Sequence, residues 1–92
     1  MSVRFTRQAL RDLIAIQSYI AIDQPIAAAR FAARLILACD GLTLFPRRGR
    51  LGIRSGTREL TIIWPYLIAY RILADETVEI ETIWHGARNR GG

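Results

Sequence analysis

The fold of this 92-residue chain is decided by residues 58–84, which read RELTIIWPYLIAYRILADETVEIETIW. Apolar and polar side chains alternate toward the end of this stretch, as in a strand that buries one face. Pro65 and the pair Asp75-Glu76 interrupt it. The pattern therefore predicts three strands, at residues 58–64, 66–73 and 77–84. Because their connections are short, we expect an antiparallel meander.

In the residues before these strands, apolar side chains recur at the spacing of an α-helix. Residues 7–22 place Ala9, Leu10, Leu13, Ile14, Ile16 and Ile20 on one face, with charged side chains opposite. Thr6 stands where a hydroxyl would cap this helix. A second helix is predicted from Pro25, which is tolerated in a first turn, to about Leu44. The short turn between them predicts a helical hairpin.

The predicted second helix is apolar on two sides. One stripe contains Phe31, Leu35 and Cys39, whereas Ile26, Leu37 and Leu44 lie nearly opposite. Such a helix is either sandwiched between the first helix and the sheet or presents one face to another chain. Tertiary packing commonly explains such patterns, so we expect the sandwich.

Residues 2–5 alternate briefly, which predicts a short first strand. The order is then β-α-α-β-β-β. We expect one α+β domain over residues 1–92, in which a helical hairpin packs on one side of a small antiparallel sheet.

Positive charge is concentrated in the loop ahead of the sheet. The formal net charge is +5, and all 13 basic residues are arginine. Residues 47–58 carry five arginines and no acid, and the Pro and Gly residues of 45–52 predict a loop there. Glycines at 49, 52 and 56 would let backbone N–H groups approach an anion. The segment is either a solvated basic loop or a site for an anionic partner, nucleic acid or acidic protein.

Several classes of site find little support. One histidine and one cysteine allow no internal disulfide and no cysteine-based zinc site, so we expect no metal and no cofactor. A phosphate-binding Walker loop needs a lysine, which the chain lacks. No apolar run approaches the ~20 residues of a membrane span, and no signal peptide is evident. We expect a cytoplasmic protein without membrane contact.

Metal-free cleavage of RNA needs proton transfer and cations that stabilise the phosphorane. His85 would supply one proton-transfer group, and Tyr66 or Tyr70 would orient the nucleotide. The cations of such a site would be Arg58, Arg71 and Arg88. Alternatively, His85 ends a strand beside a core Trp84 and has a structural role. We favour this interpretation because the sequence shows no second general base.

Six stretches together resemble a known family. They are QALRDLIAIQSYIA, DQPIAAARFAARL, LTLFPRRGR, GTREL, YLIAYRI and IWHGARNR. Their order and spacing are similar to those of the RelE/ParE superfamily of type II toxin–antitoxin toxins, and the ParE branch fits best, over about residues 3–90. The resemblance implies the fold predicted above and a bacterial growth-inhibiting toxin that a cognate antitoxin neutralises.

The resemblance leaves two activities open. RelE-like members cleave mRNA on the ribosome with an arginine on the middle strand and another in a Gly-x-Arg segment after the last strand. Gly86-Ala87-Arg88 matches the second, but Leu67 stands where the first would be. ParE-like members poison DNA gyrase by trapping its cleaved DNA complex. The resemblance therefore favours a gyrase poison with no catalytic residues, with the ribosome-dependent mRNA endonuclease and a purely binding member as alternatives.

The resemblance also implies two binding surfaces. The target, gyrase or its DNA, would contact Arg47, Arg48, Arg50, Arg58, Trp84, His85, Arg88 and Arg90. An acidic antitoxin segment that orders on binding would form a hetero-oligomer through an open sheet edge and the apolar residues Ile26, Leu37, Leu44, Tyr66 and Tyr70. The helical hairpin would also suit a homodimer.

Overall fold

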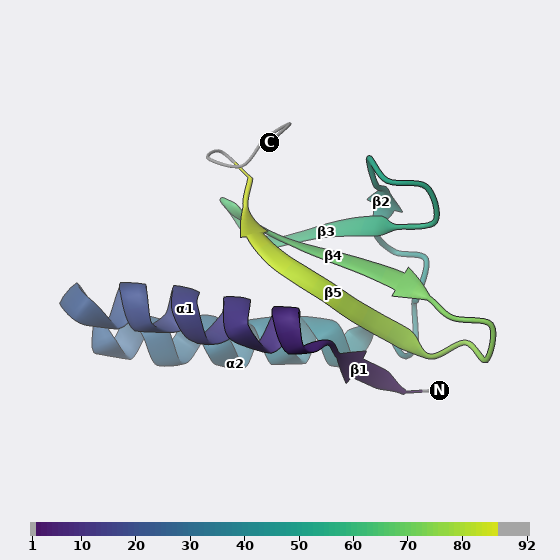
Figure 1. Cartoon of the computed structure of the whole chain (residues 1–92). Helices are drawn as coiled ribbons and strands as arrows, with labels where there is room; N and C mark the ends of the chain where they lie inside the picture. The colour runs from purple at the N-terminus through teal and green to yellow at the C-terminus, as the bar shows by residue number, and fades with distance from the viewer. Residues whose placement is uncertain (1, 87–92) are drawn as a thin grey trace.

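The computed structural model describes residues 2–86, with Ile62 and Ile63 described in their backbone only. Two helices lie side by side against one face of a twisted five-stranded sheet (Figure 1). The elements are β1 (Val3–Phe5), α1 (Arg7–Asp23), α2 (Pro25–Gly41), β2 (Arg50–Leu51), β3 (Arg58–Ile63), β4 (Tyr66–Ile72) and β5 (Val78–His85). The predicted α+β class and the strand-helix-helix-strand order are confirmed.

The sheet is mixed, so the prediction of a wholly antiparallel sheet is wrong at one edge. Its strand order is β1-β5-β4-β3-β2, and β1 runs parallel to β5, with Val3 opposite Val78 and Phe5 opposite Ile80. A parallel pair needs a long connection, and here both helices and three strands lie between the partners. The other edge, β2, lies in the segment predicted as loop and pairs Arg50 with Glu59. Two residues are too few to show an alternating pattern.

The helices begin where the sequence predicts. The Thr6 hydroxyl oxygen accepts the Ala9 N–H at 3.0 Å, and Pro25 opens α2. The second helix ends at Gly41 instead of near Leu44, because the chain continues there in a turn. Leu42 still reaches the core from this turn.

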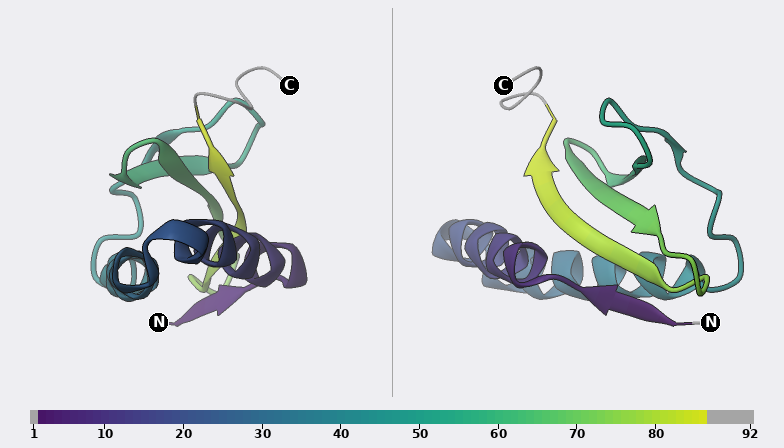
Figure 2. Two further views of the ribbon diagram at one scale, coloured as in Figure 1. Left: turned by 90° about the vertical axis from the view of Figure 1, so that its left-hand side faces the viewer. Right: turned by 45° about the vertical axis from the view of Figure 1, so that its right-hand side comes forward.

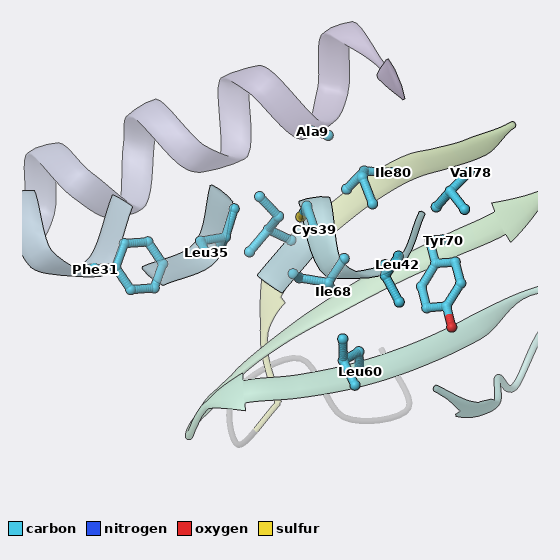
Figure 3. Close-up of a cluster of buried hydrophobic side chains, with 11 residues drawn as sticks. Ala9, Phe31, Leu35, Cys39, Leu42, Leu60, Ile68, Tyr70, Val78 and Ile80 are labelled. Carbon is cyan, nitrogen blue, oxygen red and sulfur yellow. The ribbon is translucent and has the colours of Figure 1, made fainter. Parts of the chain in front are cut away.

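The core lies between the hairpin and the sheet (Figure 3). Its main members are Ala9, Phe31, Leu35, Cys39, Leu42, Leu60, Ile68, Tyr70, Val78, Ile80 and Ile83. The Tyr70 hydroxyl also anchors residues 46–49 to the core. It donates to the Pro46 carbonyl at 2.7 Å and accepts the Gly49 N–H at 2.9 Å. A Cβ at Gly49 would lie 2.8 Å from the Glu59 carbonyl oxygen, so only glycine fits beneath this anchor.

The second apolar face of α2 is not sandwiched, contrary to the prediction. Ile26 and Leu37 are 71% and 70% exposed. Both helices lie in one layer, so each contacts the sheet with one side only (Figure 2). Leu10 and Ile14, assigned by periodicity to the buried stripe of α1, are 46% and 62% exposed.

A β-bulge in β5 sets which side chains face the core. Tyr70 pairs with Ile80 but Ala69 pairs with Thr82, so Glu81 is an extra residue in β5. The Thr6 hydroxyl donates to the Glu81 carbonyl at 2.8 Å. The Asp12 carboxylate accepts the Ile83 N–H at 3.0 Å and the Thr82 hydroxyl. The first turns of α1 therefore hold the bulge.

Replacing Thr6 by Ala is expected to remove both the helix cap and the bond to the bulge. We expect the free energy of unfolding to fall by about 1–3 kcal/mol, measured by urea denaturation. Thr6→Ser keeps the hydroxyl and should retain most of the stability. Equal losses in the two variants would contradict the role of the hydroxyl.

Burial raises the pKa of the Cys39 thiol to about 12, with a smaller contribution from the charge of Asp40. Near pH 8 the folded protein should therefore resist a thiol-specific disulfide reagent, whereas the unfolded chain reacts fully. Burying the neutral thiol contributes fully to the free energy of unfolding below pH 9.0, the pKa of the thiol in the unfolded chain. This contribution declines as the pH rises toward about 12, the pKa in the folded protein. Rapid labelling of the folded protein would contradict this assignment.

Candidate functional site

The face of the sheet that the helices do not cover, called the outer face below, contains a cavity of about 660 Å³. Glu59 and Ala69 are register neighbours, and they alternate with the core residues Leu60 and Ile68. The cavity is lined by residues of three strands, of the loop between β2 and β3 and of the start of α1, including Thr6, Gln8, Ile53, Arg54, Glu59, Ala69, Glu81 and Trp84.

Charges on the outer face are paired within the protein. The Glu81 carboxylate accepts Arg54 Nη2 at 2.7 Å on one oxygen and Arg71 Nε at 2.8 Å on the other. Arg50 Nη2 lies 3.2 Å from Glu59 Oε1. Both carboxylates are largely buried, whereas the Arg50 and Arg54 side chains are exposed. The acids thus lie beneath the arginines and neutralise much of their charge.

The arginines predicted to bind a target have different environments. Arg47 lies 3.7 Å from Glu76, and Arg58 donates to the carbonyls of Gly49 and Arg47. Arg48 makes no ion pair or side-chain hydrogen bond with any residue between 2 and 86. Arg48 and Arg58 therefore keep a charge that no described carboxylate opposes. Arg88 and Arg90 lie outside the described residues.

The predicted target surface is split between the two ends of β5. Arg47 contacts Glu76, just before this strand, whereas His85 ends it. Eight residues of strand span roughly 25 Å. The loop approaches the rest of the predicted surface through Arg54, because Arg54 and Trp84 line the same cavity.

Trp84 and His85 are neighbours at the end of β5, and Trp84 lines a cavity on each side of the sheet, whereas His85 lines only the one on the helix side. Trp84 faces the outer cavity, and its Nε1 is buried without a hydrogen-bond partner in the described part of the chain. His85 stacks edge-on against Tyr66, with ring centroids 5.3 Å apart, and Tyr66 packs against Phe31 in turn. His85 also lines a second cavity, of about 350 Å³, beside Asp12 of α1. The single histidine thus belongs to the helix side.

Of the alternative nuclease residues, the three that the structure describes are not assembled into one site. Arg71 is bonded to Glu81 on the outer face, Arg58 is bonded to loop carbonyls, and His85 is on the helix side. The Tyr70 ring is fully buried, so it cannot orient a nucleotide. Residues 2–86 contain no group of three metal-ligating side chains.

The residues predicted to contact the antitoxin differ in their exposure. Ile26, Leu37 and Leu44 are at least 70% exposed and form an apolar strip along α2 and its end. Tyr66 is half-buried between Phe31 and His85. Tyr70 belongs to the core, so its prediction as a contact residue is wrong.

Sequence comparison assigns the chain to a family. The family model described as "ParE toxin of type II toxin-antitoxin system, parDE" matches residues 3–90. The chain belongs to the ParE toxin family. The resemblance drawn from the six stretches is thereby confirmed.

Two proteins with similar sequences are both named as toxins. "Toxin RelE2" of Caulobacter vibrioides is 46% identical over 86 residues, covering 94% of this chain and 96% of the relative. "Putative toxin Y4kP" of Sinorhizobium fredii is 48% identical over 84 residues, covering 90% and 85%.

Solved structures show the same fold. A chromosomal ParDE toxin–antitoxin system from P. aeruginosa matches with a TM-score of 0.81 and 26% identity, covering 92% of this chain and 95% of that one. The RelBE2 toxin–antitoxin complex of Mycobacterium tuberculosis matches with a TM-score of 0.67 and 30% identity, covering 91% and 95%. Within residues 2–86, neither helix of this ParE-family toxin has the length and hydrophobicity to span a bilayer.

Proposed function

We propose that this ParE-family toxin arrests growth by poisoning DNA gyrase, and that a cognate antitoxin neutralises it. The toxin would stabilise the cleaved DNA complex of gyrase and so block replication in the cytoplasm. The observation that carries this proposal is the pairing of Arg54 and Arg71 with Glu81. A face whose cations are already bound to a carboxylate suits contact with a macromolecule better than catalysis on a phosphate.

Metal-free RNA cleavage makes demands that the described residues meet poorly. The reaction needs cations free to stabilise the phosphorane and a proton-transfer group beside them. Here Arg71 is engaged by Glu81, and Leu67 occupies the position where the RelE-like arginine is expected. His85 lies on the helix side, away from that pair.

The second candidate is a ribosome-dependent mRNA endonuclease. It is favoured by the name of a relative at 46% identity, RelE2, and of another at 37% identity, RelE1, both of Caulobacter vibrioides. Under this alternative His85, Arg58, Arg71 and Arg88 would act on the transcript. They would need the ribosome to bring them into one site.

The target surface of the proposed poison has two parts. Arg48 in the loop and Arg58 at the start of β3 keep a charge that no described carboxylate opposes, and Arg47 and Arg50 lie on either side of Arg48 in the sequence. Trp84 and His85 end β5, directly ahead of Arg88 and Arg90. These residues would contact gyrase or the DNA that it holds.

With purified bacterial gyrase and plasmid, the toxin should inhibit supercoiling and accumulate cleaved DNA. Replacing Arg88 and Arg90 together by Glu should abolish this effect while leaving the melting temperature unchanged. Arg7→Glu with Arg11→Glu is the matched control, because it makes the same charge change on the exposed side of α1. Cut transcripts on toxin-bound ribosomes, with plasmid supercoiling intact, would support the endonuclease instead.

The antitoxin would dock on the apolar strip of Ile26, Leu37 and Leu44. This strip is exposed, and a net charge of +5 attracts an acidic amphipathic segment. The sheet adds two short edge strands, β1 and β2, beside which further strands can pair. That structural relatives come from toxin–antitoxin complexes supports such a partner.

Leu37→Glu should weaken antitoxin binding at least about tenfold without unfolding the toxin, since the side chain is exposed. The stabilisation that the antitoxin gives in a thermal melt should shrink accordingly. Ile53→Glu makes the same charge change at an equally exposed loop residue and should bind normally. Unchanged affinity of Leu37→Glu would remove the α2 strip from the antitoxin interface.

A further inference from the structure

We propose that Glu81 determines what the outer face can bind: it fills, from within, an anion site made by Arg54 and Arg71, and so excludes single-stranded RNA. The inference rests on the proposed function in one respect, because a gyrase poison has no use for RNA held on its sheet. The three residues that form the anion site, Arg54, Arg71 and Glu81, are not among those proposed to contact the target.

The position of Glu81 is built by contacts that are distant in sequence. Glu81 is the extra residue of the β5 bulge, and bulges commonly re-aim a side chain. Its carbonyl accepts the Thr6 hydroxyl, and the next two residues are bonded to Asp12. Its side chain therefore has little freedom to leave the outer face.

The two arginines come from separate elements and bind separate oxygens. Arg54 comes from the loop between β2 and β3 and bonds Oε1 at 2.7 Å, whereas Arg71 comes from β4 and bonds Oε2 at 2.8 Å. Charge-assisted bonds of this length are among the strongest in proteins. Two guanidinium groups that share the oxygens of one carboxylate would share the oxygens of a phosphate in the same way.

Gly56 allows the loop to lie over this pair. Its φ is +80°, and a Cβ there would lie 2.9 Å from Arg71 Nη1. Any other residue would be strained in this conformation and would displace the guanidinium. The loop is thus shaped around Arg71, which argues against a chance surface ion pair.

The rest of the cavity suits a nucleotide. A volume of about 660 Å³ lies within the range of small-molecule sites. Trp84 lines it and has a buried N–H without a described acceptor. Cations combined with an aromatic ring are what single-stranded nucleic acid sites use. What opposes RNA is Glu81, whose carboxylate offsets half of the formal charge of the two arginines and occupies the place where the phosphate would lie.

Glu81→Gln tests the proposal, because it keeps the shape of the side chain and removes its charge. The probe is a short fluorescein-labelled single-stranded RNA, with binding followed by fluorescence anisotropy at several salt concentrations. The variant should bind at least about tenfold more tightly than the unaltered toxin. Its log–log salt slope should be steeper by roughly 0.7, the value for the one phosphate that the two arginines would share.

Glu79→Gln is the matched control. Glu79 is two residues away in β5 and is bonded to Arg4 at 2.9 Å, outside the cavity. The Glu79→Gln variant should bind RNA as weakly as the unaltered toxin. Adding Arg54→Gln and Arg71→Gln to Glu81→Gln should abolish the gain. Glu81→Ala is a second variant in case the amide disturbs folding, which circular dichroism would reveal.

The outcomes separate this inference from the proposed function. Folded Glu81 variants that bind RNA no better than the unaltered toxin would overturn the inference alone, leaving gyrase poisoning in place. Tight RNA binding by the unaltered toxin would overturn both. A gain in Glu81→Gln, together with no effect of the unaltered toxin on gyrase, would support the anion site and reject the proposed target.

Discussion

The constraint on which the structure depends is the extra residue in β5, held by the first two turns of α1. Without the bulge, Ile83 would lie on the opposite side of the strand from Ile80, because side chains alternate. With it, both isoleucines are buried in the core. Thr6 and Asp12 supply three hydrogen bonds to this short stretch, each worth about 1 kcal/mol. Helix packing and strand register are therefore coupled, since shifting α1 would break the bonds that hold the bulge.

The same arrangement controls the electrostatics of the outer face. The chain has a formal charge of +5, but acids lie directly beneath Arg50 of β2 and Arg54 of the following loop. Tyr70 fixes the chain ahead of β2 through Pro46 and Gly49, so the arginines cannot spread freely over the sheet. The net charge therefore attracts acidic partners at long range. The ion pairs determine at which arginines an anion can bind.

Local patterns predicted the parts of the fold that local forces determine. The Thr6 cap, Pro25 and the strands around Pro65 follow from backbone chemistry within a few residues. The parallel pairing of β1, the bulge and the Arg54–Glu81–Arg71 group join residues far apart in sequence, and no short window contains both partners. The site was predicted least well for the same reason: a run of arginines does not show which acids lie beneath it. Tyr70 is a partial exception, because it shares the parity of the buried Ile68.

The fold also connects the two surfaces proposed for the antitoxin and for the target. Phe31, in the first half of α2, packs against Tyr66, which packs against His85 at the end of β5. The beginning of α2 therefore lies beneath the end of β5, from which the proposed target edge continues. Ile26 and Leu37 are separated by about 16 Å along the helix. The strip proposed for the antitoxin and the edge proposed for the target therefore belong to elements that touch each other, because α2 supports the end of β5 through Phe31, Tyr66 and His85.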